Sequence, residues 1–185
     1  MISHLIPCAS GEQFPIGRKA AGQPAAAGTG GVRAVDWFVS TFTNKLDAKG
    51  RVSVPAEFRR VLAQQGTNGL YVIKTLSRDA SLTGFGNALL TQLSQQIKTP
   101  NPLLDRNYAA RAHGMFGQVR HMQIDDDGRI RLPDDLIAHC AIADRVAFVG
   151  LNDIFEIWNP DKLEPVAASR IGEIESAYDA SGSGA

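Results

Sequence analysis

Apolar and polar residues alternate in two neighbouring segments of this chain. Phe42, Asn44 and Leu46 fall on one face of the first segment, and Val52 and Val54 fall on one face of the second. A period of two is typical of strands that bury one face. The pattern therefore predicts two strands joined by a tight turn.

A helical pattern replaces this alternation after Pro55. Proline suits the first position of a helix, because its missing N–H group would have no partner there. Phe58, Val61 and Leu62 follow with helical spacing, which predicts a short helix with an apolar stripe. Two further strands are predicted at residues 70–73 and 81–85.

The same succession of elements returns 78 positions later in the chain. Strands are predicted again at residues 119–124, 129–132, 146–149 and 154–158, with a helix at 133–140. Two copies in one chain indicate a duplicated module that packs against its own twin. The equivalent residues are Asp47 and Asp125, Gly50 and Gly128, Arg51 and Arg129, and Pro55 and Pro133.

Helices are predicted between and after the two copies. Prolines at positions 100 and 102 separate two connecting helices, and a last helix is predicted from Asn159 and Pro160 onward. Pro165 is expected to kink that last helix or to delay its start. The first connecting helix carries the stripe Leu89, Leu90, Leu93 and Ile97, and the second carries Leu103, Leu104, Tyr108 and Met115.

Neither copy is large enough to bury a good core alone. Two copies that interleave their strands would close one barrel and leave fewer open sheet edges. We therefore predict an α+β fold, a single β-barrel of two intramolecular ββαββ repeats with helices between and after them. The expected parts are a disordered or non-native leader (1–35), a first repeat (38–86), a helical connector (87–116), a second repeat (117–159), a C-terminal helix (160–179) and a flexible tail (180–185).

The overall charge is balanced, but the two repeats differ in local charge. The chain has 19 basic and 19 acidic residues, which argues against a non-specific polyanion binder. Residues 45–60 hold five basic residues against two acidic ones, a net charge of +3. Residues 125–135 hold two arginines against five aspartates, a net charge of −3. If one repeat meets an anion, the first is favoured.

The location of the protein follows from its cysteines and its apolar runs. Cys8 and Cys140 do not make a disulfide framework, so a reduced cytoplasm is the simplest setting. No run approaches the roughly 18 apolar residues that span a bilayer, and no membrane partner is expected.

Arginines of the predicted return strands are the main candidates for binding. Val52 and Val54 face the core, so alternation turns Arg51 and Ser53 outward together. A guanidinium group can bind guanine O6 and N7 in the major groove, or clamp a phosphate. The candidate DNA-binding residues are Lys45, Lys49, Arg51, Arg129 and Arg131, and the candidate turn residues are Asp47, Gly50, Asp125 and Gly128.

Each candidate also has a plain structural interpretation. Asp47 and Asp125 are expected to cap their own turns and pair with the following arginine, and Gly50 and Gly128 to adopt positive φ. The lysines could be ordinary solvated charges, and Arg59 and Arg60 are expected to be solvated. Flanking aspartates weaken the case for Arg129 and Arg131.

Nothing in the sequence indicates catalysis. The glycine-rich segments lack a complete P-loop or dinucleotide motif, and the four histidines lack metal-ligand spacing. The aspartates at 125–127 lack the further ligands of a calcium loop. We expect no enzymatic activity, no cofactor, no metal and no small-molecule substrate.

The two motifs together resemble the MraZ family, bacterial regulators built from two AbrB-type (SpoVT-AbrB) units. The resemblance rests on residues 44–59, on residues 125–133 and on the strand Phe155–Trp158, and it covers about 38–178. It implies a swapped-hairpin barrel, a ring-like homo-oligomer and sequence-specific binding to double-stranded DNA. The implied targets are repeated elements upstream of the protein's own gene, at the head of the cell-division and cell-wall cluster, which implies a cytoplasmic, nucleoid-associated protein. The long leader departs from the family pattern.

A second interpretation remains open. Some swapped-hairpin proteins act as antitoxins, so the chain could be an oligomeric module that binds a protein instead of DNA. The acidic second repeat and the neutral total charge leave room for this alternative.

Overall fold

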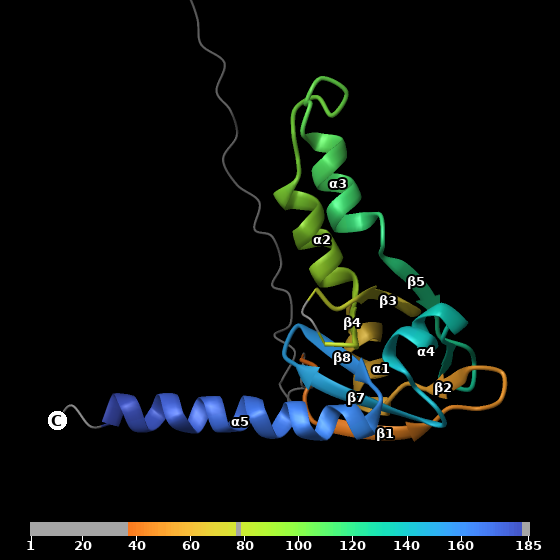
Figure 1. Cartoon of the computed structure of the whole chain (residues 1–185). Coiled ribbons are helices and arrows are strands. Elements are labelled where there is room, and N and C mark those ends of the chain that lie inside the picture. Colours follow the sequence, from red (N-terminus) through yellow and green to blue (C-terminus); the bar gives the residue numbers. More distant parts are fainter. Residues whose placement is uncertain (1–36, 77–78, 183–185) are drawn as a thin grey trace, which may run out of the picture. The chain divides into compact units, whose positions relative to one another are not determined.

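The computed structural model describes residues 37–76 and 79–182 (Figure 1). The predicted leader, residues 1–35, lies outside the described residues. The first repeat contains β1 (Thr41–Lys45), β2 (Arg51–Ser53), α1 (Ala56–Gln64), β3 (Gly69–Lys74) and β4 (Leu82–Phe85). The second contains β5 (Arg120–Gln123), β6 (Arg129–Arg131), α4 (Asp134–Cys140), β7 (Arg145–Leu151) and β8 (Ile154–Trp158). Helices α2 (Asn87–Gln96) and α3 (Tyr108–Phe116) connect them, and α5 (Pro160–Gly182) follows.

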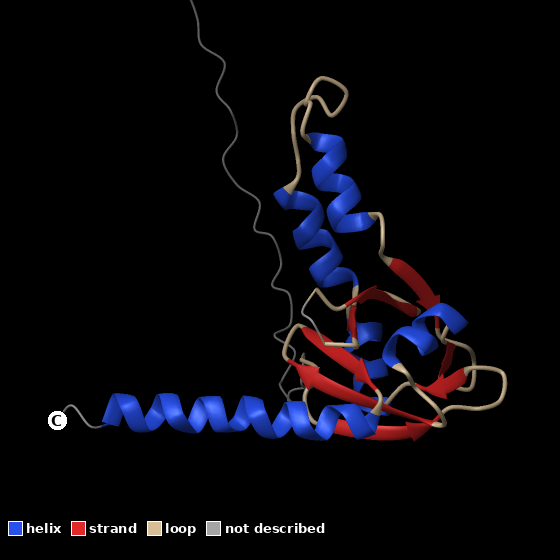
Figure 2. Cartoon of the chain, in the orientation of Figure 1, coloured by secondary structure: helices blue, strands red, loops and turns tan. Residues whose placement is uncertain are grey.

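The two repeats exchange their first strands. Six antiparallel strands form one sheet in the order β1-β7-β8-β4-β3-β5. Figure 2 draws the strands in red. Strand β1 of the first repeat pairs with β7 of the second, and β5 of the second pairs with β3 of the first. Strands β4 and β8, one from each repeat, pair in the middle of the sheet. Neither repeat therefore completes its sheet without the other.

The sheet is not closed as a barrel, which differs from the sequence prediction. Strands β1 and β5 stand at its two ends, and β2 and β6 pair with each other as a separate two-stranded ribbon. A single bridge between Leu46 and Val52 links the first turn region to this ribbon. The ribbon strands are three residues long and follow tight turns, and the backbone N–H groups of Arg51 and Arg129 bond to the turn aspartates and not within the ribbon. The α+β class is confirmed, and the closed barrel is not observed.

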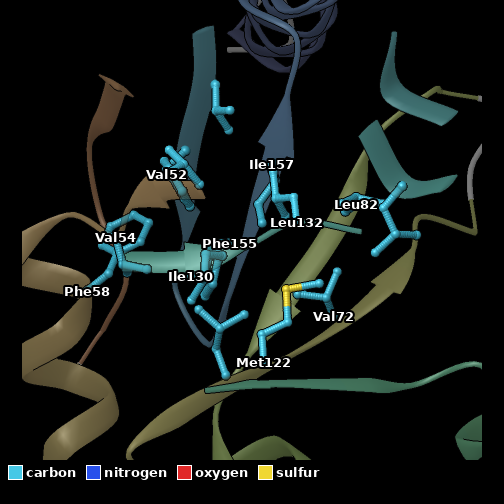
Figure 3. Packing of buried hydrophobic residues seen from close by; sticks show 14 of the residues in the cluster. Val52, Val54, Phe58, Val72, Leu82, Met122, Ile130, Leu132, Phe155 and Ile157 are labelled. Atoms are coloured by element: carbon cyan, nitrogen blue, oxygen red, sulfur yellow. The ribbon is translucent and has the colours of Figure 1, made fainter. Parts of the chain in front are cut away.

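The ribbon nevertheless completes the hydrophobic core. Val52 and Val54 from the first repeat, and Ile130 and Leu132 from the second, are each at most 2% exposed. They belong to the same buried cluster as sheet residues such as Phe155 (Figure 3). The core is thus enclosed by side chains from both repeats, although the backbone ladder remains open.

An aromatic group links α1 to the strands of the other repeat. Phe58 of α1 is fully buried, and its ring lies 5.1 Å from that of Phe155 and 6.4 Å from that of Phe148. Phe38 and Phe42 lie 5.2 and 5.5 Å from the same ring. Phe58 therefore joins the two repeats at one point of the core.

The connecting helices differ from the prediction at one boundary. The second connecting helix begins at Tyr108, and Leu103 and Leu104 lie in the preceding turn, 94% and 79% exposed. The side-chain oxygen of Asn101 accepts the N–H group of Leu103, which stabilises this turn instead of a helix.

The last helix starts where it was predicted to start. Helix α5 begins at Pro160, so Pro165 does not delay it, and the helix continues to Gly182. Arg170 fastens α5 to the sheet, because it donates to the buried carboxylate of Glu156 at 3.1 Å and lies over the Trp158 ring. Within the described ranges, no helix combines the length and apolar character that crossing a membrane requires.

Candidate nucleic-acid interface

The ribbon of β2 and β6 brings the predicted arginines of both repeats together. In its register Arg51 lies opposite Arg131, Val52 opposite Ile130, and Ser53 opposite Arg129. The central pair is buried, and the residues on either side turn outward, as strand alternation predicts. We call the outward set Arg51, Ser53, Arg129 and Arg131 the ribbon face.

The first turn is held by Asp47. One carboxylate oxygen accepts the backbone N–H groups of Lys49 at 2.9 Å and Arg51 at 2.8 Å. The other accepts Nε of Arg51 at 2.8 Å. These bonds lower the pKa of Asp47, and the backbone bond from Arg51 is the main cause. Gly50 adopts φ +72°, the left-handed region that a glycine enters without strain.

The second turn has the same backbone and a different charge arrangement. Asp125 accepts the N–H group of Arg129 at 2.7 Å, and Gly128 adopts φ +77°. Here the terminal Nη2 of Arg129 donates to Asp127, while Nε lies 3.8 Å from Asp125. The bond to Asp127 is the main cause of a raised pKa for Arg129.

Each turn is also bonded to the opposite strand of the ribbon. Val54 donates its N–H group to the carbonyl of Gly128 at 2.9 Å, and Leu132 donates to that of Gly50 at 2.8 Å. Because both turns are bonded in this way, the ribbon face and the two turns form one connected surface.

The cations of this surface are not equally available. Among the described residues, Arg51 pairs only with Asp47, through Nε, so its two terminal nitrogens remain open to a ligand. Lys49 is exposed at the tip of the first turn. Lys45 lies instead on β1, in register with Arg145, and is not part of the ribbon.

Two contacts across the repeats could not be predicted from the motifs. The Arg59 guanidinium of α1 lies against Gly128, where any added Cβ would collide with it. At the equivalent place, Ile137 of α4 lies against Gly50. Positions 59 and 137 are 78 apart, so the repeat offset makes them equivalent, but it does not give their contacts with the glycines. The first turn therefore packs against the apolar side chain of Ile137, and the second packs against the cationic side chain of Arg59.

Across the ranges 37–76 and 79–182, no group of three or more histidine, cysteine, aspartate or glutamate side chains is placed to hold a metal ion.

The two motif copies exchange strands, and their arginines lie opposite each other across a two-stranded ribbon, in an α+β protein with an open antiparallel sheet. A family model described as "MraZ protein, putative antitoxin-like" matches residues 115–176. A "Transcriptional regulator MraZ" of Xanthobacter autotrophicus is 42% identical over 77% of this chain and 92% of its own length. Proteins of the same name from Azorhizobium caulinodans and Rickettsia bellii are 37% and 36% identical, over 81% and 71% of this chain and 94% and 87% of their own lengths. The chain belongs to the MraZ family.

Proposed function

We propose that this protein is a sequence-specific, DNA-binding transcriptional regulator without catalytic activity. The observation that carries the proposal is the ribbon face, on which Arg51 and Arg131 lie directly opposite each other across a two-stranded ribbon. The names of the relatives, transcriptional regulators, support the same function. A cytoplasmic, nucleoid-associated location follows from this function.

A two-stranded ribbon fits the major groove of B-DNA, which is about 12 Å wide. Nε of Arg51 is occupied by Asp47, which fixes the direction of the side chain. The terminal fork of Arg51 then binds guanine O6 and N7 or a phosphate. Lys49 and Arg131 add contacts along the same surface, and Lys45 contributes to the phosphate contacts from β1. Arg129 adds a weaker contact, because its terminal nitrogen is paired with Asp127.

One such ribbon is small, so we propose that several copies act together as a ring-like homo-oligomer. Linked copies that meet repeated DNA elements gain affinity through effective concentration. The repeated elements lie, in this proposal, upstream of the protein's own gene and of the cell-division and cell-wall genes. This arrangement explains how a chain with zero net charge binds DNA well.

Helix α5 and the α2–α3 hairpin supply matching surfaces for the contact between copies. Ile171 and Ile174 on α5 are 56% and 62% exposed. A largely apolar groove of about 510 Å³ lies between the hairpin and the sheet, lined by Leu93 and Met115 among others. Three acidic residues and one basic residue flank the α5 isoleucines (Glu173, Glu175, Asp179 and Arg170), a net charge of −2. Three basic residues and one acidic residue occur in the hairpin (Lys98, Arg106, Arg111 and Asp105), a net charge of +2. We therefore assign the groove to α5 of a second copy.

The DNA-binding proposal is tested by Arg51→Ala on the DNA upstream of the protein's own gene. Loss of a base contact is expected to cost about 1–3 kcal/mol of specific binding, measured by fluorescence anisotropy. Arg60→Ala, which removes the same charge from the exposed side of α1, is the matched control and should retain binding. Equal affinities of wild type and Arg51→Ala, with size and fold unchanged, would refute the role of Arg51.

A salt titration separates DNA binding from an antitoxin-like protein interaction. Counterion release makes specific affinity for DNA fall steeply as salt rises. A wild-type protein that prefers its upstream DNA over a scrambled sequence of equal composition supports the regulator. No binding to either DNA at low salt rejects it and favours the protein-binding alternative.

The contact between copies is tested by Ile174→Lys in sedimentation velocity. A charge placed in the apolar groove should dissociate the oligomer into smaller species. Ser176→Lys adds the same charge on another side of α5 and should leave the size unchanged. An oligomer of unaltered size in Ile174→Lys would refute the proposed contact.

A further inference from the structure

The two turns differ at the position that precedes their glycine. The first turn carries Lys49 there, and the second carries Asp127, which is 78 residues later. In the second turn the Asp127 carboxylate accepts the terminal Nη2 of Arg129. Lys49 cannot make this bond, so the difference in one residue changes how the neighbouring arginine is used.

The two arginines present different atoms to a ligand. Arg51 pairs through Nε, and its terminal nitrogens have no partner among the described residues. Arg129 pairs through a terminal nitrogen, and its buried Nε has no hydrogen-bond partner within residues 37–76 and 79–182. A carboxylate offers an arginine the same kind of oxygen acceptor that a phosphate offers. Asp127 thus occupies the atoms that DNA would use.

Exposure and charge support the same conclusion. Arg129 is 31% exposed, and Asp127 is 68% exposed, so the pair lies at the surface where a ligand can compete for it. Asp126, the neighbouring aspartate, is exposed and makes no hydrogen bond or ion pair with Arg129 in the described structure. Asp125 lies 3.8 Å from Nε of Arg129, so the hydrogen bond to the terminal nitrogen comes from one particular carboxylate, that of Asp127.

We propose that Asp127 is a positioning residue that makes the two turns bind DNA unequally. It holds the Arg129 fork in the free protein, so that the first turn supplies the main contacts and the second engages only after this pair breaks. The inference rests on the proposed DNA binding. It adds a residue that determines how many of the ribbon arginines contact a given DNA element.

The test compares Asp127→Asn with Asp126→Asn on the DNA upstream of the protein's own gene. Both variants remove one negative charge from the same turn, but only Asp127→Asn releases Arg129. Because exposed ion pairs are weak, we expect Asp127→Asn to bind roughly two- to five-fold more tightly than Asp126→Asn. Equal affinities of the two variants would show that only the overall charge matters, and would overturn the proposal.

A double-variant cycle with Arg129→Ala identifies the route of the effect. In the wild-type background Arg129→Ala should change affinity little, whereas in the Asp127→Asn background it should remove the gain. The slope of log affinity against log salt should steepen by roughly one in Asp127→Asn if one more phosphate contact forms. A gain that survives Arg129→Ala, or an unchanged slope together with an unchanged affinity, contradicts the role of Asp127.

Asp127→Lys, which copies the first turn, is a second variant with a stronger expected effect in the same direction. Melting temperature and oligomer size are measured for every variant, so a folding defect is detected. If wild-type protein binds the DNA and Arg51→Ala binds it more weakly, while Asp127→Asn behaves as Asp126→Asn, the role of Asp127 fails and the proposed function stands. If wild-type protein does not bind, the proposed function itself fails.

Discussion

Replacing Phe58 by alanine tests whether the two repeats form one cooperative unit. The Phe58 side chain projects from α1 of the first repeat, is fully buried, and contacts Phe148 and Phe155 of the second repeat. Loss of a buried phenylalanine costs about 3–5 kcal/mol when the cavity does not collapse. The four ring contacts, with centroids 5.1 to 6.4 Å apart, place Phe58→Ala at the upper end of that range.

This loss is large relative to the stability of an ordinary domain, which is about 5–15 kcal/mol. For a chain of this size each kcal/mol shifts the melting temperature by about 2–4 °C, so a decrease of roughly 10–20 °C is expected. Phe42→Ala removes the same side chain from β1, where it is only partly buried and, among the described residues, has one ring contact, with Phe58. Phe42→Ala should therefore lower the free energy of unfolding clearly less than Phe58→Ala does.

The assay is denaturant unfolding at a fixed protein concentration, followed by circular dichroism and by tryptophan fluorescence. Trp158 is buried in β8 of the second repeat and Trp37 is 55% exposed, so fluorescence chiefly reports the second repeat. Because Phe58 joins both repeats, the two signals should shift together. A fluorescence transition that Phe58→Ala leaves in place, or a cost no larger than that of Phe42→Ala, would refute the interleaved core.

Three further predictions concern the turns and the thiol. Gly50→Ala should destabilise the fold by about 1–3 kcal/mol in thermal melts, because φ is +72° and the new methyl group would lie 3.1 Å from the Leu132 carbonyl oxygen; an unchanged melt would contradict this. The pKa of Asp47 is lowered in the folded state, so this carboxylate stabilises the fold above its ordinary pKa of 3.8, and the stabilisation is lost as pH falls further. Asp47→Asn should therefore lose less stability on acidification than wild type, and parallel plots of stability against pH for the two proteins would argue against this. Burial raises the pKa of the Cys140 thiol to about 11. In Cys8→Ser protein, where Cys140 is the remaining cysteine, a thiol reagent should therefore react only after unfolding, and rapid labelling of the native protein would contradict this prediction.

Sequence pattern was sufficient wherever the controlling interaction is local. Period-two alternation correctly turned Val52 and Val54 inward and Arg51 outward, because successive side chains of a strand point to opposite faces. The turn at Gly50 was predictable for the same reason, since its positive φ depends on adjacent residues. The helix start at Pro160 also follows from a local preference.

The sequence prediction was wrong where apolar residues could lie either in a helix or in an exposed turn. Leu103 and Leu104 fit a helical stripe by spacing, yet they lie exposed in a turn before α3. Spacing reports which residues could share a face, and it carries no information on whether anything packs against that face. In the described structure their turn is stabilised by the side chain of Asn101 instead.

The repeated motifs, the strand faces, the turns and the family resemblance could be read from the chain alone, because these depend on residues close together in it. The pairing of β1 with β7, the pairing of β2 with β6 and the open sheet are known only from the folded molecule. The same holds for the contact of Arg59 with Gly128 and for the hydrogen bond from the terminal nitrogen of Arg129 to Asp127. Backbone groups in any strand can satisfy one another equally well, so the choice of partner depends on how the complete core packs.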